Sequence, residues 1–461
     1  MIDTLNKYKI SVSEPSAQLL CWLQILLEER FGHKFQLAFV DGWVRLRLST
    51  NSGYIAIKSD IKQFSVGQAN IACELWNARI ENWMPPIEDV LPAPGAEKLK
   101  FPLIEFDGAG HLIHYDILGL SYWMLARLEE VGRTDLDNHE RFPATASHAF
   151  RYGYLERPIV DEWMDILRQV ILLQWPDLIL RHNIFSVKVS HDVDSPSFFN
   201  FIPLSTFFRN ALVSTIKNKS LVNIFKSALI RFGNQNILHR EDPYNTFEWI
   251  MDISDYYGLT SAFYFICGRS DASKDAGYEP EHSAIRNLMR RIHERGHELG
   301  LHPSYNTYKD VTLMASEAMR LRRICTEEDI SQDILGGRTH YLRWEMPSTL
   351  QGLELAGMDY DSSLGYADLP GFRCGTCFEY PAFDPMACRI LKLRIRPLIV
   401  MECTIMAERY MGLGNGDAAY KKFVKLKSAC RSVNGCFTLL WHNSSFESAQ
   451  NRALYQCVLE K

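Results

Sequence analysis

Residues 185–194, FSVKVSHDVD, decide how the second half of this chain folds. The run starts as an apolar, β-rich strand and ends in polar residues. Because side chains alternate along a strand, Asp192 and Asp194 project from one face and His191 from the other. Two carboxylates about 7 Å apart on one strand can divide the work of binding a cation and of acting on a water held by that cation. The simpler alternative is a solvated strand end that carries two ordinary acids.

Six more β-rich runs follow, and amphipathic helices separate them. Residues 281–295 carry apolar residues at i, i+3, i+4 and i+7 and end at Gly296, and residues 311–325 follow an Asp310 N-cap. This alternation predicts βα units in an α/β fold, either an open doubly wound sheet or a barrel. In both, ligands bind at the carboxyl ends of the strands. The predicted strands are residues 185–194, 262–267, 297–302, 334–341, 360–364, 391–401 and 436–442.

Residues 296–302, GHELGLH, place His302 at the end of a predicted strand, before a proline that stops strand pairing. His297 and His302 are five positions apart instead of four, which disfavours the helix of a zinc protease. In an extended segment the two histidines point to opposite sides. We therefore predict His302 as a metal ligand and His297 as a capping or core residue.

The first 180 residues have a different, α+β character. Hairpin turns separate alternating runs, and helices follow them. Histidine, cysteine and carboxylate residues do not cluster there at ligand spacing, so this region is structural or shapes the substrate site. The predicted helices are residues 16–30, 117–131 and 160–175, with Gly32 ending the first and Asp116 capping the second, and the predicted strands are residues 35–40, 43–50 and 53–59.

The composition is typical of a globular protein with two or three domains: 461 residues, 47% hydrophobic and 23% charged. The net charge of −5 gives no electrostatic reason to expect nucleic acid or an anionic membrane as a partner. No run in the sequence approaches the about 20 apolar residues of a membrane span. The opening residues 1–16 lack a basic region followed by an apolar core. We therefore expect a soluble, cytoplasmic protein.

The 11 cysteines lie mostly in apolar runs, as expected of reduced thiols that pack as small hydrophobic residues. Cys374 and Cys377 have CxxC spacing. A zinc knuckle would need a second such pair, and a redox motif should open a helix. We therefore expect neither role for this pair.

Five motifs in chain order, SHDVD, GHELGLH, RTHYLR, YDSSLG and LLWHNS, resemble those of the polysaccharide deacetylase family, the NodB homology domain of carbohydrate esterase family 4. The stretch before them resembles a poorly characterised domain that precedes such modules in bacterial glycan-related proteins. The resemblance implies a distorted (β/α)7, TIM-like barrel at residues 181–461. A smaller α+β domain of unknown role would occupy residues 1–180.

The resemblance also implies a metal site. In the family, one Asp and two His hold a divalent metal, usually zinc, which activates a water against an N-acetyl group. Asp192 would then be the general base, and Asp194 and His302 metal ligands. The second metal histidine is expected where this chain has Asn306. The site could bind zinc more weakly, accept another divalent ion, or recruit His340 as its third ligand.

The family's Arg-x-Pro-Tyr motif is RTHY here, with His340 in place of the proline. The resemblance implies that Arg338 orients the base and that the Tyr341 N–H helps to hold the oxyanion. His340 shares the predicted strand face of Arg338 and so points toward the site, although the lost proline removes a rigid turn. His442, in LLWHNS, would protonate the leaving amine.

The sequence thus predicts a metal-dependent hydrolase that removes an acetyl or formyl group from an amino sugar. Without a secretion signal, a nucleotide- or lipid-linked glycan precursor fits better as the substrate than a mature cell wall. One alternative is a glycan-binding or scaffold protein that kept the barrel and lost catalysis. Another is a hydrolase of a different non-peptide carbon–nitrogen bond.

Overall fold

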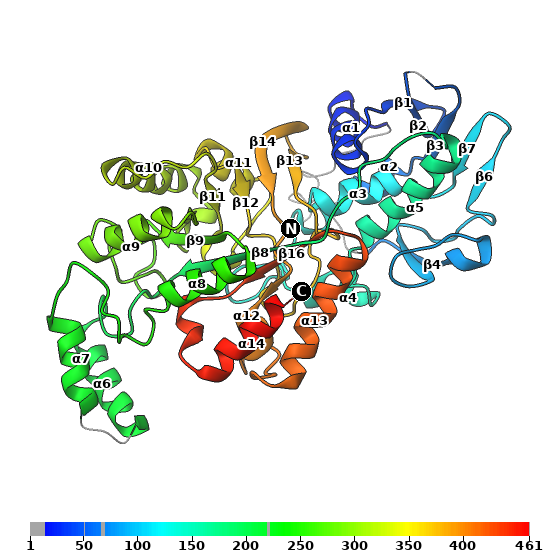
Figure 1. Cartoon of the computed structure of the whole chain (residues 1–461). Helices are drawn as coiled ribbons and strands as arrows, with labels where there is room; N and C mark the ends of the chain where they lie inside the picture. Colours follow the sequence, from blue (N-terminus) through cyan, green and yellow to red (C-terminus); the bar gives the residue numbers. More distant parts are fainter. Residues whose placement is uncertain (1–13, 50, 66–69, 219–221, 461) are drawn as a thin grey trace.

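A computed structural model describes residues 14–49, 51–65, 70–218 and 222–460, and it shows a mixed α/β protein with two main sheets (Figure 1). Residue 50, the end of the predicted strand 43–50, lies outside the described residues. So do residues 1–13, on which the expectation about a secretion signal largely rests. Among the helices of the described ranges, none has the length and apolar character needed to cross a membrane.

The second half of the chain forms a nine-stranded sheet with the order β13-β14-β12-β11-β10-β9-β8-β16-β15. Every neighbouring pair is parallel except β13 and β14. Within the described ranges, no ladder joins β13 to β15, so the hydrogen bonds leave this sheet open. The strands are β8 (Ser186–Val193), β9 (Ser261–Ile266), β10 (Glu298–His302), β11 (Gly336–Gly337), β12 (Tyr360–Asp361), β13 (Tyr380–Asp384), β14 (Arg389–Ile395), β15 (Val400–Met401) and β16 (Cys436–Leu440).

Three predicted strands differ from the structure, and one of them, the run 360–364, is a strand only at β12. The run 391–401 is split into β14 and β15 because Pro397 has no N–H to donate and restricts the residue before it. The run 334–341 is a strand only at β11. The chain then enters a 3₁₀ turn, His340–Leu342, in which Tyr341 and Leu342 have left-handed φ angles of 61° and 58°. A turn, and not a strand face, therefore presents His340.

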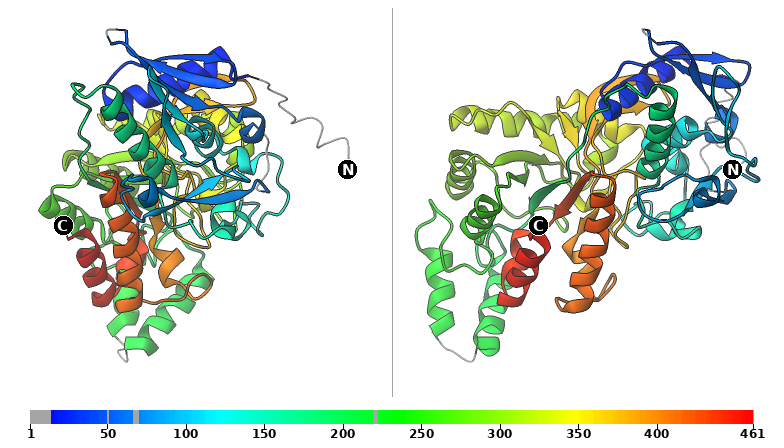
Figure 2. Two further views of the ribbon diagram at one scale, coloured as in Figure 1. Left: turned by 90° about the vertical axis from the view of Figure 1, so that its right-hand side faces the viewer. Right: turned by 45° about the vertical axis from the view of Figure 1, so that its right-hand side comes forward.

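Helices flank this sheet, and the predicted ones are present. In α9, the apolar residues of the predicted stripe are buried, and Gly296 follows the helix with a φ of 74°. Asp310 caps α10 by accepting a hydrogen bond from the N–H of Leu313. The helices are α6 (Leu204–Asn218), α7 (Val222–Phe232), α8 (Phe247–Tyr257), α9 (Ser283–Glu294), α10 (Val311–Glu327), α11 (Ser348–Leu355), α12 (Glu402–Met406), α13 (Asp417–Ser432) and α14 (Ala449–Leu459). Among them, α6 and α7 form a hairpin that projects from the body of the protein (Figure 2).

The first part of the chain contains a five-stranded sheet with the order β1-β2-β3-β7-β6. Its first helix, α1, is capped by Ser16 and ends at Gly32, whose φ is 80°, as predicted. The predicted helix 117–131 stops early as α3 because Arg127 adopts a left-handed φ of 50°. The elements are α1 (Ala17–Phe31), β1 (Gln36–Val40), β2 (Trp43–Arg47), β3 (Tyr54–Lys58), α2 (Ile61–Phe64), β4 (Cys73–Asn77), β5 (Val90–Pro94), β6 (Ile104–Phe106), β7 (Gly110–Ile113), α3 (Ile117–Leu125), α4 (His148–Arg151) and α5 (Ile159–Gln174).

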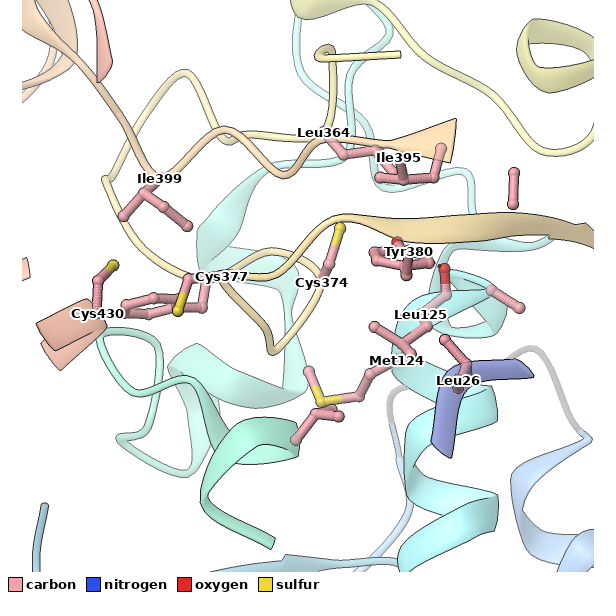
Figure 3. Packing of buried hydrophobic residues seen from close by; sticks show 14 of the residues in the cluster. Leu26, Met124, Leu125, Leu364, Cys374, Cys377, Tyr380, Ile395, Ile399 and Cys430 are labelled. Atoms are coloured by element: carbon pink, nitrogen blue, oxygen red, sulfur yellow. Dashed lines mark hydrogen bonds between the residues drawn. The ribbon is translucent and has the colours of Figure 1, made fainter. Parts of the chain in front are cut away.

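One hydrophobic core joins the two parts of the chain. Helix α1 lies against β13 and β14, and the Trp22 indole N–H donates to the Pro381 carbonyl at 2.8 Å. Figure 3 shows Leu26 and Met124 of the first part in the same cluster as the Cys374 and Cys377 thiols. These two thiols are buried among apolar side chains, which raises the pKa of Cys374 to about 11.

A buried carboxylate links the same two parts. Asp161 of α5 accepts hydrogen bonds from Arg30 at 2.5 Å, from the Thr376 hydroxyl at 2.7 Å and from the Cys377 N–H at 2.9 Å. Its side chain is inaccessible to solvent. Removing one member of such a network leaves its partners unpaired in a region that water does not reach.

We expect Asp161→Ala to lower the free energy of unfolding by about 3–5 kcal/mol, because it strands the buried partners of this carboxylate. Asp89→Ala is a matched control, since Asp89 pairs with Arg79 at 3.4 Å on the surface. This control should cost about 0–1 kcal/mol. Urea unfolding followed by tryptophan fluorescence measures both. Equal losses in the two variants would show that Asp161 does not join the two parts.

Candidate functional site

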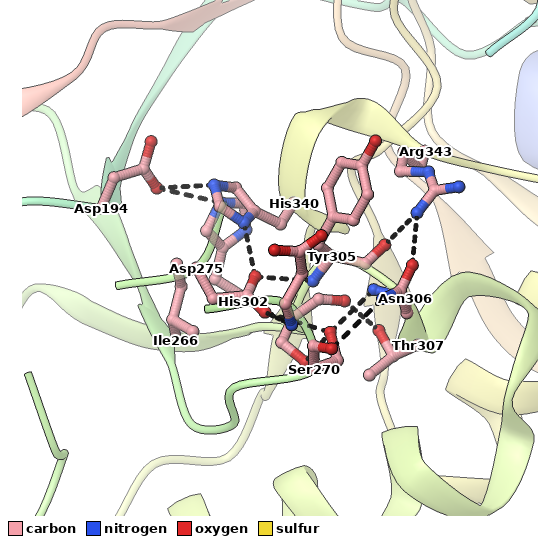
Figure 4. A network of polar contacts seen from close by, with 12 residues as sticks. Asp194, Ile266, Ser270, Asp275, His302, Tyr305, Asn306, Thr307, His340 and Arg343 are labelled. Atoms are coloured by element: carbon pink, nitrogen blue, oxygen red, sulfur yellow. Dashed lines mark hydrogen bonds and ion pairs between the residues drawn. The ribbon is translucent and has the colours of Figure 1, made fainter. Parts of the chain in front are cut away.

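Three side chains meet at the carboxyl ends of neighbouring strands. Asp194 follows β8, His302 ends β10, and His340 lies in the turn after β11. The Asp194 Oδ1 atom is 3.3 Å from His302 Nε2 and 3.7 Å from His340 Nε2 (Figure 4). One potential ligand atom from each residue lies within 4.8 Å of the others. The structure thus brings together the three residues as a group that could hold a metal ion.

Hydrogen bonds fix how the two imidazoles are oriented. The Nδ1 of His302 donates to the carbonyl of Arg338, and the Nδ1 of His340 donates to Asp275 Oδ1 at 3.0 Å. The other ring nitrogen, Nε2, is then directed toward Asp194 in both residues. Partners of this kind hold metal-binding histidines in the required tautomer.

Two polar atoms of the group are left without a hydrogen bond. Asp194 Oδ1 and His302 Nε2 are both buried, and neither has a hydrogen-bond partner among the residues that the structure describes. Burial alone would favour a neutral acid, but the charges of His340 and His302 lower the pKa of Asp194 well below its usual range. Asp194 is therefore an ionised acceptor that faces two imidazole nitrogens.

These atoms fit a divalent metal. In a tetrahedral zinc site with bonds of about 2.0–2.1 Å, neighbouring ligand atoms are about 3.3 Å apart. The separations of 3.3 Å and 3.7 Å between Asp194 and the two histidines are close to that value. Three protein ligands with a fourth position open are typical of catalytic zinc sites, and a carboxylate with two imidazoles also suits other divalent ions.

Asn306 is not part of this group. Its side-chain oxygen accepts a hydrogen bond from Arg343 at 3.0 Å, and its amide donates to the Ser270 carbonyl at 3.2 Å (Figure 4). An amide held at both ends in this way is directed away from Asp194. Of the two predicted alternatives for the third ligand, the geometry therefore favours His340 over Asn306.

Asp192 lies beside the group and is held by Arg338. The Arg338 Nη1 donates to Asp192 Oδ1 at 2.8 Å, while its Nη2 donates to the Ser190 and Ser362 hydroxyls at 2.8 and 2.9 Å. The other oxygen, Asp192 Oδ2, is 3.6 Å from His302 Nε2. One oxygen is thus fixed, and the second faces the candidate metal position.

His442 follows strand β16, which pairs with β8 on the side away from β9 and β10. Its Nε2 is 3.7 Å from Asp194 Oδ2, and its Nδ1 donates to Glu402 Oε1 at 2.7 Å. Burial disfavours the charged imidazolium, but the Glu402 carboxylate, followed by Asp194, outweighs burial and raises the pKa of His442 to about 10. His442 is therefore a protonated imidazolium at neutral pH.

Glu402 was not predicted. It is buried at the start of α12 and also accepts a hydrogen bond from the Ser445 hydroxyl at 2.8 Å. A signal for it was present, because Glu402 directly follows the predicted strand 391–401 and so stands at a strand end. The run was predicted as one strand, whereas Glu402 follows the separate short strand β15, which begins after Pro397.

Two further predicted residues have clear positions. Tyr341 lines the cleft over the site, and its carbonyl accepts a hydrogen bond from Arg141 at 2.9 Å. His191 points to the other side of β8, as predicted, where its Nδ1 donates to the Trp441 carbonyl at 2.6 Å. Burial there lowers the pKa of His191 to about 3, so it stays neutral.

A cleft of about 470 Å³ opens above these residues. Asp192, Asp194, His302, His340 and His442 all line it, so the predicted groups share one solvent-accessible space. Cationic side chains line it as well, and they come from segments far apart in the sequence, which is why the sequence analysis missed them. These cations are Arg141, Arg269, Lys274 and Arg409.

Residues 9–176 match a family of unknown function, DUF7033. The sequence matches no curated protein. Among solved structures, a protein named as a polysaccharide deacetylase from Mycobacterium smegmatis is similar at 17% identity and a TM-score of 0.37, over 61% of this chain and 83% of that one. The Puue allantoinase is similar at 12% identity and a TM-score of 0.33, over 59% of this chain and 82% of that one. A protein named as a polysaccharide deacetylase from Pseudomonas aeruginosa PAO1 is similar at 12% identity and a TM-score of 0.33, over 60% of this chain and 84% of that one. TM-scores this low do not establish a common fold.

We expect His340→Ala and Asp194→Ala to weaken zinc binding by more than about 100-fold. Even the loss of a residue that only hydrogen-bonds to a metal ligand usually lowers metal affinity by about 10- to 100-fold. Asp275→Asn should lie in that smaller range, because Asp275 orients His340 and is not itself one of the three ligands. Asp275 also accepts hydrogen bonds from the Tyr305 and Asp271 N–H groups, so thermal unfolding should check that this variant keeps its fold. Asn306→Ala is the matched control and should bind zinc like the unaltered protein. Titration calorimetry of chelator-treated protein measures all four. A loss in Asn306→Ala as large as that in His340→Ala would contradict the ligand assignment.

Proposed function

We propose that this chain is a metal-dependent hydrolase that removes an N-acyl group, foremost acetyl, from an amino sugar. The convergence of Asp194, His302 and His340 at one point, with Asp192 and His442 beside it, carries this proposal. Amide hydrolysis requires a strong nucleophile, stabilisation of the oxyanion and a proton for the leaving nitrogen. The side chains around this point can meet each requirement.

Asp194, His302 and His340 would hold the metal, for which zinc is the first choice. A divalent ion there would supply a Lewis acid and lower the pKa of a bound water from 15.7 to about 7. Asp192 would be the general base, because Arg338 fixes one of its oxygens and leaves the other free beside the ligand group. Arg338 therefore orients the base and balances its charge.

His442 would be the general acid. It is protonated at neutral pH, its Nδ1–H is bound to Glu402, and its Nε2–H points into the cleft toward Asp194. A proton carried on Nε2 is therefore available for the leaving amine. The backbone N–H of Tyr341 would contribute to the oxyanion site, since the left-handed turn places this residue on the wall of the cleft.

We also infer that residues 181–461 form a distorted (β/α)7 barrel of the polysaccharide deacetylase family and that residues 1–180 form an attached α+β domain. Support comes from the order of the motifs, from the parallel strands that carry them, and from the site at the carboxyl ends of those strands. Arg141 reaches the cleft from residues 1–180, so this domain would help to shape the substrate site.

The cleft favours a substrate with an anionic group, such as a nucleotide- or lipid-linked sugar phosphate. Arg269, Lys274 and Arg409 line it, and none of the three forms an ion pair with a carboxylate within the described ranges. The carboxylates that line the same cleft, Asp192 and Asp194 among them, already have cationic or imidazole neighbours. The unpaired cations are therefore available for a phosphate.

Asp192→Asn should lower kcat by about 10²- to 10⁴-fold, the usual contribution of a general base, and should leave metal binding intact. Asp194→Ala should lose both turnover and metal. Acetate release tests this with a panel of acetylated amino sugars, free and nucleotide-linked, with elemental analysis of the same samples. Turnover retained in Asp192→Asn would rule out Asp192 as the base. Absence of acetate release from every substrate by metal-loaded protein would contradict the proposed activity.

Glu402→Gln should move the alkaline limb of the pH profile of kcat/KM to lower pH. Glu402 raises the pKa of His442 to about 10, so the acid is protonated below that pH and is lost above it. Without this carboxylate, the pKa should fall toward the ordinary value of about 6.5. Glu408→Gln is the control, because Glu408 is exposed just beyond the same helix. An alkaline limb that stays in place would exclude His442 as the acid held by Glu402.

A further inference from the structure

The segment between Asp194 and Glu241 has a charge opposite to that of the whole chain. It contains no Asp or Glu residue, although the chain as a whole has a net charge of −5. Helices α6 and α7 occupy most of it and project from the body of the protein (Figure 1). Its basic residues are Arg209, Lys217, Lys219, Lys226, Arg231 and Arg240.

Both helices of this hairpin expose a stripe of large apolar side chains. Their spacing of three or four positions places them on one face of each helix. Phe208 is 65% exposed and Phe225 is 77% exposed. Soluble proteins rarely expose so many large apolar side chains together, and such a patch marks an interaction surface. The stripes are Leu204, Phe208, Leu212 and Ile216 in α6, and Val222, Phe225, Leu229 and Phe232 in α7.

Apart from Phe232, whose ring centroid lies 5.6 Å from that of Phe207, these stripes are not the inner faces of the hairpin. A separate small core of Phe199, Phe207, Ala211 and Ile230 already joins the two helices and the segment before them. Arg231 also ties the hairpin to that segment by donating to the carbonyls of Phe199 and Ile202. The helices therefore pack against each other through their inner sides. The apolar side chains on their outer faces are exposed and are not needed for that packing.

We propose that the α6–α7 hairpin docks on the surface of an anionic lipid bilayer. Amphipathic helices with Phe and Leu on one face and Lys and Arg beside it bind the headgroup region, and anionic lipids attract the basic residues. Helices of 15 and 11 residues are too short to span a bilayer, so the hairpin lies in the interface plane. Arg209 and Arg240 are exposed and free of carboxylate partners within the described ranges.

The hairpin is continuous with the mouth of the cleft. Residues 201–203, which directly precede α6, line the same cleft as Asp194 and His442. Docking of the hairpin would therefore bring the cleft close to the membrane surface. The docking itself does not depend on the proposed hydrolase activity, because it rests on the exposed stripes and on the charge of the segment.

Vesicle flotation of the full chain tests this proposal. We expect the protein to float with vesicles of phosphatidylcholine mixed with phosphatidylglycerol, less with pure phosphatidylcholine, and less at high salt because salt screens the attraction. The double variant Phe208→Ser/Phe225→Ser should bind at least about tenfold more weakly, since two large apolar side chains no longer enter the interface. The control Phe106→Ser/Ile179→Ser changes two residues that are 61% and 88% exposed in the first part of the chain, and it should bind like the unaltered protein.

Three results would overturn the proposal. The first is that the unaltered protein does not float with either kind of vesicle. The second is that the Phe208→Ser/Phe225→Ser variant floats as well as the control variant. The third is that light scattering without vesicles shows a dimer that the Phe208→Ser/Phe225→Ser variant converts to a monomer, which would assign the stripes to contact with a second copy. Thermal unfolding of the variants at an unchanged midpoint would confirm that the fold is intact, as expected for exposed positions.

Discussion

The carboxylate of Asp194, which is partly exposed but has a buried Oδ1 atom, sets the requirement that the rest of the site meets. The Nε2 atoms of His302, His340 and His442 lie 3.3, 3.7 and 3.7 Å from its two oxygens. Its Oδ1 atom is shielded from water, and negative charge there is costly without compensation, so this carboxylate needs positive charge nearby. Each imidazole is in turn held at Nδ1 by an acceptor that lies outside the group: the Arg338 carbonyl, Asp275 or Glu402. The polar network of the site is organised around one carboxylate.

The turn that presents His340 is supported by the first part of the chain. Tyr341 and Leu342 both adopt left-handed φ angles, a conformation that costs non-glycine residues about 1–3 kcal/mol each unless the surroundings hold it. Arg141 donates to the Tyr341 carbonyl, and Arg343 donates to the His139 carbonyl at 2.8 Å. Contacts from residues 139–141 thus fix this turn. These contacts explain how the turn holds His340 beside Asp194 and His302.

Local sequence patterns predicted the strands and the residues at their ends. Strands β8, β9, β10 and β16 come from continuous β-rich runs, and alternation correctly separated His191 from Asp192. The choice between His340 and Asn306 was not accessible in this way, because it depends on Ser270 and Arg343, which lie elsewhere in the sequence. The same holds for the basic lining of the cleft, since Arg141, Arg269 and Arg409 come from three distant segments. Strand β13 was missed because its short run YPAFD contains Pro381, which argues against a strand except at the edge of a sheet, where β13 lies.

If the chain is the proposed hydrolase, its cleft separates the charges that would bind the substrate from the charges that would react with it. Asp192 and Asp194 line the cleft, and Arg338 and the histidines balance their charges. Arg269 and Lys274 also line it, and neither pairs with a carboxylate of the residues that the structure describes. A phosphate held by those cations would contribute equally to the bound substrate and to the transition state, so it would set affinity and position. Asp192, Asp194 and the histidines would act only as charge develops at the amide, so they would determine the rate. A substrate with its anionic group some distance from the acylated nitrogen suits this division better than a small neutral sugar.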